Sequence, residues 1–126
     1  RVVDLKAQAD GRWFVIVDAG MTDLLRPALY GAWHGIEAVS PRAGAPIACA
    51  VVGPVCETSD TLGKARHLPR VIVGDLLAVR DTGEYGAIMA SNYNRRPMAA
   101  EVLVDGAAWR VVRRRQTVDD MLQWDE

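Results

Sequence analysis

The chain has 126 residues, a formal net charge of −1 at pH 7 and a hydrophobic fraction of 50%. These values are typical of a globular domain and exclude a fibrous, low-complexity or disordered chain. The length suits one domain with a sizeable core. Both halves of the chain are close to neutral, so we expect neither a nucleic acid nor a membrane as partner.

Processing and redox signals are few. The first four residues have no signal-peptide character, and no starting methionine is present, so we expect a piece of a longer polypeptide. The two cysteines, Cys49 and Cys56, make no disulfide framework and, without a second Cys/His pair, no metal site. We therefore expect a reducing, cytoplasmic location.

The first predicted elements are a strand and a helix. Residues 13–18 form an apolar run rich in β-formers, which predicts a buried strand. Thr22 or Asp23 can cap a following helix, with Pro27 in its first turn. Gly35 is the predicted end of that helix.

The middle of the chain alternates between loops and strands. Residues 40–46 hold prolines and glycine and predict a loop, and residues 47–55 predict a second buried strand. The polar mixture in 56–70 favours an irregular loop. Residues 71–80 indicate a third strand region interrupted by a glycine, and 81–86 have the composition of a turn.

The C-terminal third contains the clearest local signal. Residues 87–97 give no clear assignment, whereas Asp105-Gly106 between two β-rich runs predicts a hairpin over 101–115. A short helix is expected over 117–124, capped by its first threonine. The fold class expected from these elements is mainly β, a Greek-key-like barrel or sandwich with one or two short helices.

The strongest chemical cluster follows the second predicted strand. The rigid Gly53-Pro54 break would hold Cys56 and Glu57 at the rim of a sheet. A thiol and a carboxylate are a common pairing of proton donor and anionic group in active sites. The alternative is a polar loop with an incidental cysteine.

Two further candidate groups contain tyrosines. Arg26 and Tyr30 are four residues apart, so one helical face would present both to a carboxylate ligand. An arginine that merely covers a half-buried tyrosine is the alternative. Tyr85, between Gly83 and Gly86, can project into a site or pack over the turn.

Other motifs give weaker indications of function. Alternation along a strand would split the basic run at 110–115 between two faces, which does not favour nucleic-acid binding. His34 and His67 are isolated, so no metal ligand is expected. Neither a phosphate-binding glycine motif nor a nucleophile elbow is present.

Read in order, these clusters resemble the C-terminal β-domain of the diaminopimelate decarboxylases, pyridoxal-phosphate enzymes of the alanine racemase-like fold type. The resemblance spans residues 13–115, and the order of seven motifs argues against chance. The motifs are Val17-Asp18-Ala19-Gly20-Met21, Arg26-Pro27-Ala28-Leu29-Tyr30, Gly53-Pro54-Val55-Cys56-Glu57 with Asp60, Gly74-Asp75-Leu76-Leu77, Glu84-Tyr85-Gly86, Ser91-Asn92-Tyr93-Asn94 with Arg96-Pro97, and Glu101-Val102-Leu103-Val104-Asp105-Gly106.

The resemblance implies a role for each candidate. Arg26 and Tyr30 fall where the family binds a substrate carboxylate, and Glu57 falls where it binds the distal amino group of meso-2,6-diaminopimelate. Cys56 falls at the position of the proton donor after decarboxylation. Tyr85 falls where the family contacts both cofactor and substrate.

The resemblance also implies an assembly. Residues 1–126 would be a single C-terminal β-domain, with the N-terminal pyridoxal-phosphate-binding α/β barrel absent. The expected activity, conversion of meso-diaminopimelate to L-lysine and CO₂, would require that barrel and a homodimer in which Cys56 and Glu57 enter the partner's site. The only lysines, Lys6 and Lys64, match no cofactor motif, so the chain alone should be inactive.

Two other functions stay open. A sister decarboxylase would act on ornithine, arginine or lysine, although the ornithine and arginine enzymes carry Asp at the position of Glu57. A catalytically silent binding or regulatory homologue would be expected to have lost part of the site. Retention of all five residues favours an enzyme over a silent homologue, and Glu57 favours diaminopimelate as its substrate.

Overall fold

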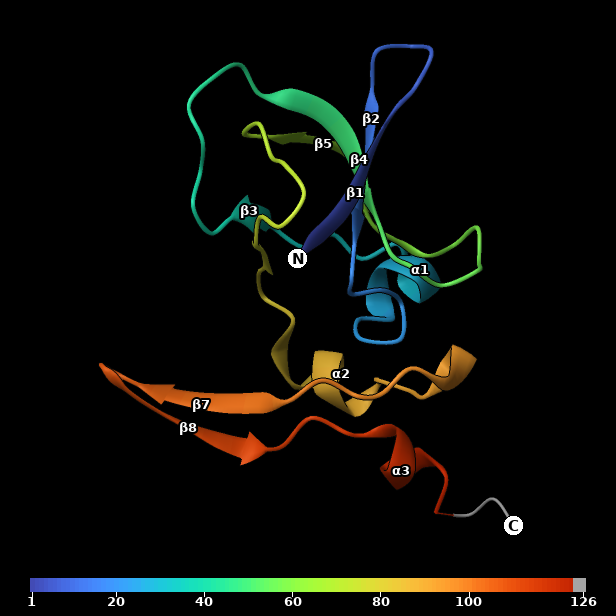
Figure 1. Ribbon diagram of the computed structural model, residues 1–126, viewed down its shortest axis with the longest axis vertical. Helices are drawn as coiled ribbons and strands as arrows, with labels where there is room; N and C mark the ends of the chain where they lie inside the picture. The colour runs from blue at the N-terminus through green and yellow to red at the C-terminus, as the bar shows by residue number, and fades with distance from the viewer. Residues whose placement is uncertain (124–126) are drawn as a thin grey trace.

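The computed structural model describes residues 1–123, and these residues form short strands with few helices (Figure 1). In chain order the elements are β1 (Val2–Ala7), β2 (Trp13–Val17), α1 (Arg26–Tyr30), β3 (Ile36–Ala38), β4 (Ile47–Val52), β5 (Thr61–Leu68), β6 (Leu77–Val79), α2 (Gly83–Ile88), the 3₁₀ turn η1 (Tyr93–Arg95), β7 (Glu101–Asp105), β8 (Ala108–Arg113) and α3 (Val118–Met121). The predicted mainly β class is confirmed. None of the helices within residues 1–123 has the length and apolar character that crossing a membrane requires.

Three separate sheets make up the domain. The largest has the strand order β1-β2-β4-β5, with β2 and β4 parallel and the other two pairs antiparallel. β3 pairs with β6, and β7 pairs with β8. Figure 1 shows the four-stranded sheet in the upper half and the β7–β8 hairpin with α3 at the lower end. Within residues 1–123 the sheets share no ladder, so they do not close into the barrel that was expected.

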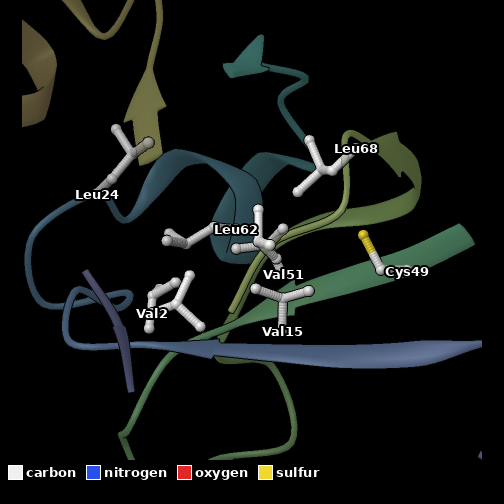
Figure 2. Packing of buried hydrophobic residues seen from close by; sticks show 9 residues of the cluster. Val2, Val15, Leu24, Cys49, Val51, Leu62 and Leu68 are labelled. Carbon is white, nitrogen blue, oxygen red and sulfur yellow. The ribbon is translucent and has the colours of Figure 1, made fainter. Parts of the chain in front are cut away.

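The core lies against the four-stranded sheet. Val15 on β2 and Cys49 and Val51 on β4 are at most 2% exposed, because alternate side chains of a strand point to one face. Leu62 and Leu68 of β5 belong to the same cluster, and Figure 2 shows these side chains packed together. The cluster also includes Val2, Val17, Leu24 and Val71. The predicted strands at 13–18 and 47–55 are confirmed with slightly shorter bounds.

Three strands were missed by the sequence patterns. β5 lies inside the segment 56–70, where an irregular loop was wrongly predicted. Its pairing with β4 contains register shifts, and Ala65 has a φ of +50°, so the alternation of apolar residues is broken. β1 is an edge strand that carries charged residues, and β3 has only three residues.

The first helix is shorter than predicted. A turn precedes it, in which Asp23 Oδ2 accepts a hydrogen bond from the Gly20 amide at 2.9 Å. Pro27 occupies the first turn of α1, as the sequence indicates. The helix ends at Gly31, whose φ of +65° reverses the chain before Gly35 is reached.

The segments 71–80 and 81–86 also differ from the predictions. Only β6 is extended, because Asp75 Oδ2 accepts a hydrogen bond from the Ile72 amide at 2.9 Å and closes a turn there. The predicted turn at 81–86 is largely replaced by α2. Asp81 precedes that helix with a φ of +55°, which redirects the chain.

The ion pair between Asp75 and Arg42 predicts a pH-dependent stability. Two hydrogen bonds, 2.9 and 2.8 Å long, join the guanidinium to the carboxylate. The hydrogen bond from Arg42, assisted by the Ile72 amide, lowers the pKa of Asp75 to about 2. A lowered carboxyl pKa stabilises the fold above the unfolded pKa of about 4, and this stabilisation disappears as the pH falls to about 2.

We therefore expect the Arg42→Gln chain to lose less stability than the wild-type chain between about pH 4 and pH 2. Urea unfolding followed by circular dichroism measures this difference. Arg110→Gln is the matched control, because Arg110 is exposed and has no ion pair among the described residues. Parallel curves for the wild-type and Arg42→Gln chains would contradict the assignment.

The C-terminal predictions are confirmed in their main features. The hairpin forms, with its two-residue turn at Gly106 and Ala107, one residue later than predicted. Thr117 caps α3 through a capping box, in which each of Thr117 and Asp120 accepts a hydrogen bond from the other's backbone amide. The predicted end of this helix at Trp124 lies outside the described residues.

Candidate functional site

Asp60 holds the loop that carries Cys56 and Glu57. Its carboxylate is buried, with 3% of the residue exposed. Oδ1 accepts a hydrogen bond from the Met21 amide and Oδ2 accepts one from the Val55 amide, both at 2.6 Å. One buried side chain therefore fixes the loop after β4 against the loop after β2.

Two glycines allow these loops to approach each other. A Cβ at Gly53 would lie 2.3 Å from Asp60 Oδ2 and 2.6 Å from Gly20 Cα. A Cβ at Gly20 would lie 2.8 Å from both carboxylate oxygens of Asp60. Because a side chain has no room at either position, glycine is required by the close approach.

Tyr93, which the sequence patterns do not predict as a site residue, lies beside Cys56 and Glu57. Tyr93 Oη donates a hydrogen bond to Glu57 Oε1 across 36 positions in sequence. This hydrogen bond and the charge of Glu57, followed by burial and the nearby Cys56, raise the pKa of Tyr93. Cys56 is a free, exposed thiol. We refer to Cys56, Glu57 and Tyr93 as the thiol–carboxylate group.

Arg26, Tyr30 and Tyr85 form a second cluster, the guanidinium group. Arg26 Cζ lies 5.8 Å from the ring centre of Tyr30 and 5.3 Å from that of Tyr85. Both tyrosines are more than half exposed. Within residues 1–123 no carboxylate pairs with Arg26, so its N–H groups remain available to an anion.

The structure thus places the five predicted residues in two separate groups. Among the described residues, no hydrogen bond, ion pair or ring contact joins the guanidinium group to the thiol–carboxylate group. The nearest link is a pocket of about 300 Å³ lined by Leu25, Glu57 and Tyr93, since Leu25 precedes Arg26 in the chain.

The sequence patterns missed two of the residues that shape the site. Tyr93 lies in the segment 87–97, which received no assignment, and its partner is distant in sequence. In the sequence analysis Tyr93 and Asp60 were each named only as members of a motif. The spacing of Asp60 after a strand-ending Gly-Pro break was the available signal, because buried acidic side chains often close such loops on backbone amides.

Other surfaces add nothing to this site. A pocket of about 730 Å³ lies between α2 and the β7–β8 hairpin, and its Glu101 and Arg113 pair with each other at 2.6 Å. None of the five predicted residues lines it. In the part of the chain that the structure describes, no group of three or more His, Cys, Asp and Glu side chains could hold a metal ion.

Comparison with known proteins identifies the fold family. Residues 1–83 match the family described as the pyridoxal-dependent decarboxylase, C-terminal sheet domain. The chain belongs to this family. The resemblance inferred from the seven sequence motifs is thereby confirmed, and so is the assignment to a pyridoxal-dependent class.

Curated and solved relatives match most of the chain. The diaminopimelate decarboxylases of Neisseria meningitidis serogroup A and Pseudomonas aeruginosa are each 57% identical, over 86% of this chain and 27% and 26% of their own lengths. The structure of the Helicobacter pylori enzyme complexed with L-lysine is 45% identical with a TM-score of 0.86, over 96% of this chain and 29% of that chain. The chain spans about a quarter of the curated relatives.

Proposed function

We propose that this domain recognises the substrate in a decarboxylase that converts meso-diaminopimelate to L-lysine and CO₂. The observation that carries the proposal is that one domain presents two opposite charges: the Arg26 guanidinium, which no carboxylate within residues 1–123 pairs with, and the exposed Glu57 carboxylate. A substrate whose far end bears a carboxylate and an ammonium group needs both charges. The names of the relatives support the same substrate.

Each charged group has a matching part of the substrate. Arg26, with the Tyr30 ring beside it, would bind the distal carboxylate through charge-assisted hydrogen bonds. Glu57 would accept hydrogen bonds from the distal ammonium. L-Lysine keeps both distal groups, so the same side chains would hold the product.

The family's pyridoxal group supplies an electron sink for the negative charge that develops when CO₂ leaves. Tyr85 fits a contact with it, because its phenol is 54% exposed beside Arg26. Lys6 and Lys64 lie on β1 and β5, outside both site groups. The lysine that binds the cofactor would therefore come from an N-terminal α/β barrel of the parent polypeptide.

Cys56 would provide the proton that completes the reaction. When the bond between Cα and the carboxyl carbon breaks, CO₂ departs, the bonding electron pair is left on the remaining part of the substrate, and Cα then needs one proton. The exposed Cys56 thiol would donate its proton there, and solvent would return one to sulfur.

A homodimer with shared sites accounts for the two separate groups. Each active site would contain Arg26 of one subunit together with Cys56 and Glu57 of the other. On the β7–β8 hairpin, Trp109 is 70% and Val104 67% exposed. Such exposed apolar side chains are expected where another subunit or domain covers the surface. Both cysteines are free, which fits a reducing, cytoplasmic location.

The test is CO₂ release by the full-length parent polypeptide loaded with pyridoxal phosphate. Meso-diaminopimelate, L-ornithine, L-arginine and L-lysine would be supplied separately. Turnover of meso-diaminopimelate alone is expected. Turnover of a different amino acid would overturn the substrate, and turnover of none would favour a silent homologue.

Shortening the recognition carboxylate should reduce turnover. In the parent enzyme, Glu57→Asp is expected to lower kcat/KM for meso-diaminopimelate about 10- to 100-fold, because one methylene moves the carboxylate by more than 1 Å. Steady-state kinetics measure the change. Glu37→Asp on β3 is the control, since that exposed carboxylate belongs to neither site group. Equal kinetics for both variants would remove Glu57 from the substrate site.

A further inference from the structure

Tyr93 holds one oxygen of the Glu57 carboxylate and leaves the other oxygen unused. Its hydroxyl donates to Oε1. Among residues 1–123 no side chain or backbone group donates to Glu57 Oε2. A hydrogen bond to one oxygen restricts the rotation of the carboxylate and leaves its second oxygen able to accept a further hydrogen bond.

Both partners are anchored to the same segment of chain. On either side of Tyr93, the Ser91 amide donates to the Thr22 carbonyl at 3.0 Å and the Arg96 guanidinium donates to the Asp18 carbonyl at 2.5 Å. The Glu57 loop is tied to Met21 in that segment through the buried Asp60. The loop after β2 is therefore a common support that sets where Tyr93 and Glu57 meet.

The chemistry of the donor matters as much as its position. The pKa of Tyr93 is raised by its hydrogen bond to Glu57 and by the charge of that group, so the phenol remains a protonated donor at neutral pH. A neutral donor orients the carboxylate without cancelling its negative charge. A lysine or arginine in its place would form an ion pair and weaken the attraction for an ammonium group.

We infer that Tyr93 is a positioning residue, which fixes the Glu57 carboxylate so that its free oxygen accepts a hydrogen bond from the distal ammonium of the substrate. This inference rests on the proposed function. It assigns specificity for the distal amino group to a pair of residues, one of them from η1, rather than to Glu57 alone.

The test uses four forms of the full-length parent enzyme, each loaded with pyridoxal phosphate: wild type, Tyr93→Phe, Glu57→Ala and the double variant. Calorimetry measures binding of L-lysine and of 6-aminohexanoate, which is L-lysine without the α-ammonium group. Tyr93→Phe should weaken L-lysine binding about tenfold, as expected for a hydrogen bond to a charged group. It should leave 6-aminohexanoate binding unchanged, and in turnover it should raise KM for meso-diaminopimelate far more than it lowers kcat.

The double variant separates positioning from a general structural role. If Tyr93 acts through Glu57, adding Tyr93→Phe to Glu57→Ala changes L-lysine binding no further. An equal tenfold loss in both backgrounds, an equal loss for both ligands, or wild-type binding by Tyr93→Phe would overturn the inference while leaving the decarboxylase function in place. A wild-type parent that turns over none of the amino acids would overturn the proposed function, and the inference with it.

Discussion

Replacing Asp60 with asparagine should lower the free energy of unfolding of the chain by about 3 kcal/mol. The two carboxylate oxygens each accept one backbone N–H, from Met21 and from Val55, in a site that is 3% exposed. An asparagine offers one oxygen and one NH₂ group, so one of the two buried amides would face another donor. The penalty includes both the lost charge-assisted hydrogen bond and the unsatisfied N–H.

Urea unfolding of the 126-residue chain, followed by circular dichroism, measures this effect. Asp4→Asn is the matched control, because Asp4 accepts a single hydrogen bond from the Leu5 amide at an exposed position. That substitution should change the stability by less than about 0.5 kcal/mol. If Asp60→Asn were no more destabilising than Asp4→Asn, the buried carboxylate would not stabilise the packing of the loop after β4 against the loop after β2.

Removing the Cys56 thiol should slow the parent enzyme strongly. Cys56→Ala is expected to lower kcat for meso-diaminopimelate about 10²- to 10⁴-fold, the range for loss of a positioned general acid. Binding of L-lysine should stay within about twofold of wild type, because in the proposed site Arg26 and Glu57 would bind its charged groups. Single-turnover CO₂ release and L-lysine calorimetry measure the two quantities separately.

Cys49→Ala is the control, because it makes the same substitution at a buried position. Cys49 is 2% exposed in the core, and burial raises the pKa of its thiol, which stays protonated. Its replacement should reduce stability and leave kcat per folded enzyme unchanged. A Cys56→Ala enzyme with normal kcat and reduced stability would assign Cys56 a structural role instead.

Mixing two inactive parent enzymes tests whether sites are shared between subunits. One variant lacks the Cys56 thiol and the other lacks the Arg26 guanidinium. In mixed dimers, one of the two sites would receive both intact residues, so activity should return on mixing. Activity that never returns would place Cys56 and Arg26 in the same subunit's site.

The sequence by itself determined features that depend on neighbouring residues. The apolar runs of β2 and β4, the hairpin signal at Asp105-Gly106 and the Thr117 cap are all local patterns. The structure contains both strands, the cap and the hairpin, whose turn lies one residue later than predicted. The order of motifs likewise predicted the decarboxylase family. The adjacency of Cys56 and Glu57, and the four-residue spacing of Arg26 and Tyr30, are fixed by chain geometry alone.

Only the tertiary structure decided which distant residues meet. Tyr93 reaches Glu57 across 36 residues, and Asp60 reaches the Met21 amide across 39. Neither contact has a local signature, because an acidic residue that closes a buried loop looks in sequence like any solvated one. β5 was hidden for a related reason: its irregular register with β4 is set by packing against β4 and the core, and that packing overrides the periodicity by which a strand is predicted.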